Sequence, residues 1–283
     1  MKKVLAFDIG GTNTRLALFN EKLENEKEII VPTIVGDKEK FLSAIVDLIN
    51  KFDLKDVVAI GAGVPGVVDR EKSKIIVLPN MHIGDIDFGD FLKEKFGLPV
   101  YLRNDAEVAC LGEAYSPVGK DYENVFFITI STGLGGALCV SGDNADYVTE
   151  IGHTITTYKN ANYEYEQIAS GTGLVKLAEI NGLKVKNAKE LFELIRENDS
   201  KALEIFKDWK MLINRFIKMI EDSYEPNVIF MTGGVLKNKD LFFDDLVNSH
   251  KDTPIRECYY DDHAGLVGAA VYALRKQEII WFN

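Results

Sequence analysis

Two patterns of apolar residues alternate along the 283 residues of this chain. Short apolar runs beside turn-forming residues predict strands at 4–9, 14–19, 27–34, 57–64, 99–105, 124–132, 136–140 and 227–232. Apolar residues three and four positions apart predict helices at 37–52, 87–96, 106–115 and 263–276, with a mostly helical insertion that extends to residue 225. Strands that alternate with helices in this way are typical of the α/β class.

The strand, turn and strand at residues 4–19 return at 125–140. Each copy has a turn rich in Gly, Thr and Ser between two apolar strands. Glycines let backbone N–H groups come close to an anion, and the hydroxyls of Thr12, Ser131 and Thr132 would add donors. A single Gly-Gly turn between strands is usually only a turn. Because the pattern occurs twice, we expect both hairpins to bind phosphate.

These hairpins differ from the common phosphate-binding loops. Neither contains G-x-x-x-x-G-K-[ST] or G-x-G-x-x-G, and a strand follows where a P-loop has a helix. The segments DIGGTNTR and STGLGG instead resemble the actin-like ATPase and sugar-kinase superfamily, and within it the ROK family of sugar kinases and repressors. The resemblance extends over nearly the whole chain. It implies two actin-like, ribonuclease H-like domains with a nucleotide and sugar cleft between them.

No low-complexity linker divides the chain, so we expect a hinge rather than a flexible tether between the domains. The expected boundary gives a smaller N-terminal domain over residues 1–110 and a larger C-terminal domain over 111–283. The closing segment 264–276 is rich in small residues, which suits close packing. It could therefore pack back on the first domain.

Charge and cysteine content narrow the range of partners. With 33 Lys and Arg against 44 Asp and Glu, the net charge is −11, which opposes binding to nucleic acid and to anionic membranes. No apolar run approaches the roughly 20 residues that cross a bilayer, and the N-terminus enters a strand without a signal peptide, so we expect a cytoplasmic protein. The scattered Cys110, Cys139 and Cys258 indicate neither disulfides nor a thiolate zinc site.

Asn104 and Asp105 lie where a predicted strand meets a predicted helix. Ligands of α/β sheets bind at this carboxyl edge, but both residue types also cap helices, and the local pattern alone favours Asp105 as a cap. The segment RNDAEVACLGEA resembles the ROK segment whose Asp is the catalytic base. The resemblance implies that Asp105 accepts the proton of a sugar hydroxyl as it attacks the γ-phosphoryl group, with Asn104 in the sugar site.

A second group of polar residues follows in TEIGHTIT and YEQIASGTGL. In isolation, a lone His is usually structural, and a Glu in a first helical turn is ordinary. These segments resemble the ROK sugar pocket, which implies that Glu150, His153 and Glu166 bind sugar hydroxyls. The same resemblance places Asn80, in LPNM, in the sugar site and Gly66, in GAGVPG, in the adjoining loop.

The resemblance also implies a nucleotide site. Asp8 stands where a carboxylate could hold Mg²⁺ directly or through water. The segment FMTGGVL resembles the family's adenosine-side loop, although TGG after a strand is by itself only a turn. The expected nucleotide- and phosphate-binding residues are Asp8, Gly10, Gly11, Thr12, Asn13, Thr132, Gly133, Gly135, Thr232, Gly233 and Gly234.

Two departures from the family pattern lie on the sugar side. Most ROK kinases have a C-x-C-G-x-x-G-C zinc cluster between the pocket His and the following Glu, whereas HTITTYKNANYEYE contains no cysteine. We therefore expect a protein that needs no zinc, in which Tyr158, Tyr163, Glu164, Tyr165 or a backbone carbonyl orients His153 instead. The segment LPNMHIGD also lacks the Trp that follows the family's PN motif.

These observations predict a Mg²⁺-requiring, ATP-dependent sugar kinase, which we expect to be a homodimer, with glucose as the expected acceptor. Fructose, N-acetylmannosamine and N-acetylglucosamine are alternatives, and polyphosphate is an alternative donor that the acidic composition does not favour. A sugar-sensing ROK repressor would carry an N-terminal helix-turn-helix, for which MKKVLAFDIGG leaves no residues. An actin- or chaperone-like ATPase would leave Asp105, Glu150, His153 and Glu166 without a role.

Overall fold

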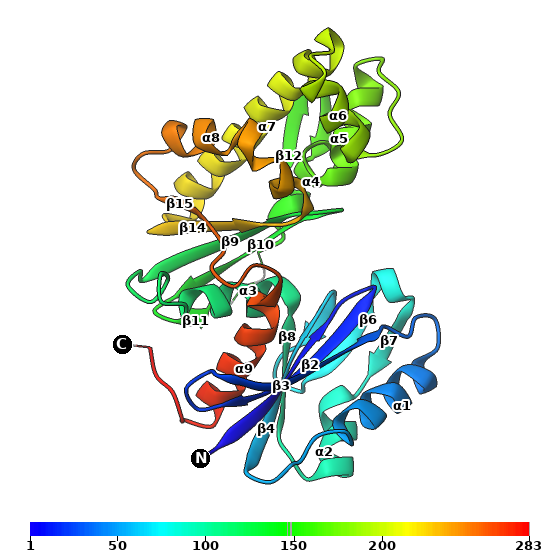
Figure 1. The fold of residues 1–283 in the computed structure, drawn as a ribbon, viewed down its shortest axis with the longest axis vertical. Helices are drawn as coiled ribbons and strands as arrows, with labels where there is room; N and C mark the ends of the chain where they lie inside the picture. Colours follow the sequence, from blue (N-terminus) through cyan, green and yellow to red (C-terminus); the bar gives the residue numbers. More distant parts are fainter. Residues whose placement is uncertain (146, 148, 283) are drawn as a thin grey trace. The chain divides into compact units, whose positions relative to one another are not determined.

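The computed structural model describes residues 1–145, 147 and 149–282 (Figure 1). Contacts divide the chain into two compact units. Unit 1 contains Met1–Asp121, Ser141–Asn144 and the segment from His263 onward, and unit 2 contains Tyr122–Val140 and Ala145–Asp262. Residues 111–121 belong to unit 1. The closing helix, which the sequence allowed to pack on the first domain, also belongs to unit 1.

A five-stranded mixed sheet forms the centre of unit 1. β1 (Lys3–Ile9) and β2 (Asn13–Asn20) are the first predicted hairpin, and β3 (Asn25–Pro32) pairs antiparallel with β2. β4 (Val57–Val64) pairs parallel with β1, and β8 (Val100–Asn104) pairs parallel with β4. The strand order is β3-β2-β1-β4-β8. The carboxyl ends of β1, β4 and β8 therefore meet at one edge of the sheet.

Helices cover both faces of this sheet. On one face, Leu5, Phe7 and Ile9 of β1 join an apolar core with α1 (Lys38–Ile49) and α2 (Phe88–Phe96). On the other face, α3 (Asp105–Ala114) packs against α9 (Ala264–Lys276), which also contacts β1 and β4 (Figure 1). A Cβ on Gly61 of β4 would lie 2.0 Å from Ala269 O, so only glycine lets α9 come this close.

A smaller antiparallel sheet and two short elements complete unit 1. The strands of this sheet run in the order β5-β6-β7. The hydrophobic pattern did not predict β6. Ile76 and Val77 are adjacent apolar residues that are both exposed, so the apolar and polar positions of this strand do not alternate as they do in a half-buried strand. The bounds of these elements are β5 (Val67–Asp69), β6 (Lys74–Leu78), η1 (Pro79–Met81), β7 (Ile83–Ile86) and β11 (Asp143–Asn144).

Unit 2 repeats the sheet arrangement of unit 1. β9 (Asn124–Ile130) and β10 (Leu134–Val140) form the second predicted hairpin. β14 (Val228–Thr232) pairs parallel with β9, and β15 (Ile255–Glu257) pairs parallel with β14. The order β10-β9-β14-β15 matches β2-β1-β4-β8, so the duplication seen in the sequence is also a duplication of topology. The predicted α/β class is confirmed.

A long helix, α7 (Ser200–Tyr224), runs through the apolar core of unit 2. Trp209 of α7 is fully buried, and its indole Nε1 donates to Ala169 O at 2.9 Å. Among the described residues, no helix combines the length and the apolar character needed to cross a membrane.

The expected helical insertion of unit 2 also contains a β-hairpin. Its strands are β12 (Ile155–Tyr158) and β13 (Ala161–Glu164), which are too short for their periodicity to stand out in the sequence. The remaining elements are η2 (Ile151–His153), α4 (Tyr165–Ala169), α5 (Gly171–Ile180), α6 (Ala188–Arg196), η3 (Gly234–Leu241), α8 (Phe243–Ser249) and η4 (Asp261–His263).

Gly268→Ala should strongly destabilise unit 1. A Cβ at residue 268 of α9 would lie 1.6 Å from Val108 O on α3, so the two helices would have to move apart. We expect the free energy of unfolding to fall by about 3 kcal/mol or more in urea denaturation. Gly11→Ala is the control and should change it far less, because its Cβ would have no heavy atom within 4 Å. Equal stability of Gly268→Ala and wild type would contradict the described packing.

Candidate active site

The turn of the first hairpin is fixed by the chain that follows β3. Gly10 N donates to Asn13 O at 2.9 Å and closes the turn. Thr33 N donates to Thr12 O at 2.9 Å, and Thr33 Oγ1 donates to Gly10 O at 2.7 Å. Gly11, Thr12 and Asn13 remain exposed. Two carbonyl groups of the turn thus accept hydrogen bonds from Thr33. Carbonyl oxygens that are bonded within the protein do not point at a ligand, which favours binding of an anion at the exposed turn.

Asp8 and Asp105 lie on the same side of the sheet of unit 1. Alternate residues of β1 face α9, and Asp8 is one of them: a Cβ at Gly265 of α9 would lie 3.2 Å from Asp8 Oδ1. β8 ends at Asn104, and Asp105 is the first residue of α3, which covers the same face. The two carboxylates are close enough for the charge of Asp8 to raise the pKa of Asp105.

Asn104, rather than Asp105, caps helix α3. Asn104 Oδ1 accepts from Ala106 N at 2.9 Å, and Glu107 Oε2 accepts from Asn104 N at 3.3 Å, which completes a capping box. Asp105 Oδ1 also accepts from Ala106 N at 2.9 Å. The local pattern that favours Asp105 as the cap is therefore wrong by one residue, and Asp105 is the first residue of the helix itself.

The pKa of Asp105 is raised to about 6. Burial of the carboxyl group is the largest cause, and the charges of Asp8 and Glu107 add to it, while the hydrogen bond from Ala106 N opposes it. A carboxyl group with a pKa near neutrality gains and loses its proton readily at physiological pH. This is the property that a general base requires.

Gly66 and Asn80, both expected near the sugar, are placed differently. Gly66 O accepts from Asn104 Nδ2 at 3.1 Å, and a Cβ at Gly66 would lie 2.1 Å from Val77 O. Only glycine therefore lets this loop run so close to β6. Asn80 lies in the exposed turn η1, which follows the end of β6 at Leu78. Gly66 is thus hydrogen-bonded directly to Asn104, whereas Asn80 is exposed in the turn after β6.

In unit 2, the turn of the second hairpin is bonded to Glu166. Glu166 Oε2 accepts from Leu134 N at 2.9 Å. A Cβ at Gly133 would lie 2.5 Å from the same oxygen, so the carboxylate occupies the space that a side chain would need. Gly135, expected in the turn, lies inside β10 opposite Thr129. A predicted sugar-binding residue and a predicted phosphate-binding turn are therefore in direct contact.

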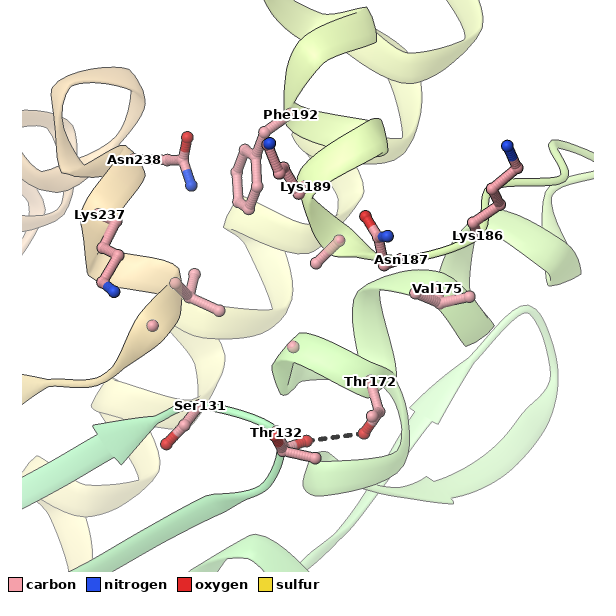
Figure 2. Close-up of a pocket in the computed structure, with 14 residues that line it drawn as sticks. Ser131, Thr132, Thr172, Val175, Lys186, Asn187, Lys189, Phe192, Lys237 and Asn238 are labelled. Carbon is pink, nitrogen blue, oxygen red and sulfur yellow. Dashed lines mark hydrogen bonds between the residues drawn. The ribbon is translucent and has the colours of Figure 1, made fainter. Parts of the chain in front are cut away.

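The start of α5 is bonded to the same turn. Gly171 N donates to Ser131 O at 2.7 Å. Thr172 Oγ1 donates to Thr132 O at 2.7 Å, the bond drawn in Figure 2. Together with the bond from Leu134, these contacts hold the hairpin and the segment 166–172 as one block.

His153 is oriented by Glu164. Its Nδ1 lies 2.9 Å from Glu164 Oε2, and its Nε2 lies 3.9 Å from Glu150 Oε2. The hydrogen bond to Glu164 is the main reason that the pKa of His153 is raised, and the charges of Glu150 and Glu166 add to it. Of the orienting partners that the sequence offers, the structure selects Glu164. It also brings Glu150, His153 and Glu166 into one electrostatic group.

The tyrosines of this interval belong to the interior instead. Tyr158 is buried, and its hydroxyl donates to Asp208 Oδ2 at 2.5 Å. Tyr165 is buried against Phe216 of α7, with ring centroids 4.9 Å apart, and Tyr163 packs on the same core. Within the described part of the chain, no three His, Cys, Asp or Glu side chains are grouped so that they could hold a metal ion.

The loop after β14 lies beside the second hairpin. Gly233 has a φ of +109°, and a Cβ there would lie 2.4 Å from Ile130 O at the end of β9, so this position requires glycine. Thr232 Oγ1 donates to Asp261 Oδ1 at 2.9 Å. Gly234 then begins η3.

A pocket of about 800 Å³ lies in unit 2 between these loops and α6 (Figure 2). Thr132 of the hairpin, Thr172 of α5 and Gly234 are among the residues that line it. The volume is in the range of pockets that bind small molecules. The further lining residues are Ser131, Gly171, Val175, Lys186, Asn187, Ala188, Lys189, Phe192, Val235, Lys237 and Asn238.

Sequence reasoning missed the wall of this pocket that α6 provides. Asn187 is the N-cap of α6, and its Oδ1 accepts from Glu190 N at 2.9 Å. Such a cap before an amphipathic helix is visible in the sequence, but it indicates a helix and not a ligand. Phe192 on the same helix faces the pocket, although helical periodicity marks it only as a core residue (Figure 2).

Known proteins match this chain over most of its length. A model of the ROK family matches residues 4–276. An N-acetyl-D-glucosamine kinase of Haemophilus influenzae is 28% identical, over 95% of this chain and 98% of that protein. A glucokinase of Halalkalibacterium halodurans is 27% identical, over 82% of this chain and 80% of that protein. The crystal structure of a ROK hexokinase from Thermus thermophilus has a TM-score of 0.85 at 25% identity, covering 98% of this chain and 99% of that one.

The raised pKa of Asp105 should appear in the pH dependence of stability. The folded pKa is about 6, above the unfolded value of roughly 4, so the folded chain binds this proton more tightly. The resulting stabilisation is complete below about pH 4 and is lost as the pH rises through about 6. Asp105→Asn cannot ionise, so its stability relative to wild type should rise across this window by up to about 3 kcal/mol. Urea unfolding of both proteins at several pH values measures this, and a constant difference would contradict it.

Proposed function

We propose that this chain, which belongs to the ROK family, is an ATP-dependent sugar kinase that transfers the γ-phosphoryl group to a hexose hydroxyl. The observation that carries the proposal is Asp105, a carboxyl group at the start of α3 with a pKa of about 6 on the same face of the sheet as Asp8. A base for a sugar hydroxyl works best when its pKa lies near the working pH.

Asp105 acts as the general base in this proposal. In its ionised form it accepts the hydroxyl proton while the sugar oxygen bonds to the γ-phosphorus and the bond to the departing ADP oxygen breaks. Proton transfer of this kind contributes about 10²–10⁴ in rate. Asn104 holds the base in place, because it caps α3 and also donates to Gly66 O.

Mg²⁺ fits the acidic end of the sheet of unit 1. Asp8 is the residue that would hold it, directly or through water. The charge of Asp8 already raises the pKa of Asp105, and a divalent cation would offset the repulsion between these carboxylates. When bound, Mg²⁺ neutralises charge on the phosphate groups of the nucleotide. The part played by Asp8 is to bind and orient, and Asp105 remains the proton acceptor.

Unit 2 supplies groups for both substrates. Glu150, His153 and Glu166 offer acceptors and donors to sugar hydroxyls. The pocket of about 800 Å³ receives the adenosine, with the ring of Phe192 as an apolar surface for the base. The turn at Thr132 offers backbone and hydroxyl donors to phosphate groups.

Glucose is the first candidate acceptor, as the sequence suggests. N-acetyl-D-glucosamine is the second, because a relative that matches 95% of this chain is named for that sugar. An ATP-coupled assay across glucose, fructose, N-acetylmannosamine and N-acetylglucosamine distinguishes them. Calorimetric binding of a sugar without turnover of any of the four would favour a sugar-sensing protein and contradict the kinase proposal.

Asp105→Ala should lower kcat by about 10²–10⁴ and change the KM for sugar far less, because the base acts mainly in the transition state. Wild-type activity should also fall towards acid pH as Asp105 becomes protonated, with a midpoint at or below about 6, because Mg²⁺ bound at Asp8 would lower the pKa of Asp105. Steady-state kinetics at saturating ATP measure both. Asp90→Ala, at an exposed aspartate of α2, is the control and should behave as wild type. Activity of Asp105→Ala within about threefold of wild type would refute the assignment.

Asp8→Asn should raise the Mg²⁺ concentration needed for half-maximal activity, because an amide is a weaker ligand than a carboxylate for a hard cation. Titration of activity with Mg²⁺ at fixed ATP and sugar gives this value. Glu39→Gln, at an exposed acid of α1, is the matched control. If the curves of Asp8→Asn and wild type coincide, Asp8 does not hold the metal.

A further inference from the structure

We propose that Glu164 is a positioning residue for the sugar-binding side of unit 2, where it orients the ring of His153 and caps the helix that carries Glu166. This inference rests on the proposed function, because it takes His153 and Glu166 to contact the sugar. Its basis is the place of one carboxyl group between two elements, the turn η2 and the helix α4.

The first contact fixes the histidine ring. His153 Nδ1 lies 2.9 Å from Glu164 Oε2, and because a carboxylate only accepts hydrogen bonds, Nδ1 is the nitrogen that carries the proton. Nε2 is then the nitrogen left for a ligand, and it lies 3.9 Å from Glu150 Oε2. The charged groups that face the ring are Glu164, Glu150 and Glu166, and each of them favours the protonated ring and raises its pKa.

The second contact fixes the helix. Glu164 and Gln167 form a capping box at the start of α4, in which Glu164 N donates to Gln167 Oε1 at 3.1 Å. Within the same first turn, Glu166 Oε2 accepts from Leu134 N at 2.9 Å. Glu166 is therefore held on one side by the cap and on the other by the second hairpin.

One side chain thus couples two groups of the sugar site. The interval from His153 to Glu166 offers no thiolate that could hold a metal beside the ring, and the carboxylate provides the orienting contact instead. Without it, the ring is free to rotate and to move its proton between the two nitrogens, and the start of α4 is loosened. The expected consequence is weaker sugar binding with the proton acceptor Asp105 intact.

Four variants test this inference. Glu164→Ala removes the contact with His153 and the side-chain half of the capping box, although its backbone N–H can still donate to Gln167 Oε1. Glu164→Gln keeps the size and an acceptor oxygen but removes the charge. Gln167→Ala removes the capping partner and leaves the contact between His153 and Glu164 in place. Glu179→Gln is the matched control: the same substitution is made at an exposed glutamate of α5, whose partner Lys176 lies 2.9 Å away.

NMR titration of the His153 imidazole reports on the first contact without any need for turnover. His153→Gln assigns its signal among the four histidines of the chain. Because a negative partner favours the protonated ring, its removal lowers the pKa of His153. The titration midpoint should move to lower pH in both Glu164 variants and stay at the wild-type value in Gln167→Ala and Glu179→Gln. An unchanged midpoint in both Glu164 variants would overturn the inference.

Kinetics with glucose and N-acetyl-D-glucosamine test the consequence for the sugar. Glu164→Ala should raise the KM for the accepted sugar about tenfold and leave kcat within about threefold, the pattern of lost ground-state binding, and Glu164→Gln should show a smaller rise. A rise of the same size in Gln167→Ala would show that capping alone is responsible and overturn the inference. So would stoichiometric zinc that is lost on chelation together with sugar affinity. If none of glucose, fructose, N-acetylmannosamine and N-acetylglucosamine is phosphorylated, the proposed function fails, and the NMR titration still decides whether Glu164 orients the ring.

Discussion

Close backbone contact between α9 and the rest of unit 1 is the constraint on which the candidate base depends. Gly61, Gly112 and Gly268 leave no room for a side chain, since a Cβ on each would lie within 2.4 Å of a backbone carbonyl oxygen. These contacts let α3 and α9 lie directly on one face of the sheet, which brings the first residue of α3 near Asp8. Burial and like charge then give Asp105 a proton affinity that an exposed aspartate lacks. The glycines that permit this close packing therefore contribute to the burial that raises the pKa of Asp105.

Charge is distributed unevenly over the chain. The net charge is −11, yet the described residues that line the pocket of unit 2 include Lys186, Lys189 and Lys237, and none of these described lining residues is Asp or Glu. A pocket lined by lysines is more favourable to an anion than the net charge of the chain suggests. The acidic composition of the whole chain therefore says little about how favourable this pocket is to an anion.

Local patterns predicted those parts of the candidate site that lie within one continuous segment. Both hairpins and the turn after β14 were visible because their Gly, Thr and Ser residues lie together in short stretches of the sequence. The cap that the local pattern predicts for α3 lies one residue after the observed cap. Asn and Asp both suit a cap, and only the residue at which β8 ends decides between them. The sequence limited the orienting partner of His153 to a few residues. The fold of the hairpin β12-β13 then places Glu164, and not a tyrosine, within hydrogen-bonding distance of His153. The α6 wall of the pocket could not be predicted, because contacts between distant segments leave no periodic signal.

The bond between His153 and Glu164 also has a consequence for the conditions that the protein tolerates. Metal-binding thiolates are oxidised readily, whereas an imidazole and a carboxylate contain no sulfur to oxidise. Of the cysteines in the chain, Cys110 and Cys139 are buried, away from solvent-borne oxidants. The orientation of the His153 ring therefore depends on protonation and on the folding of the hairpin β12-β13, which carries Glu164, and peroxide or a shortage of metal in the surroundings would leave this bond intact.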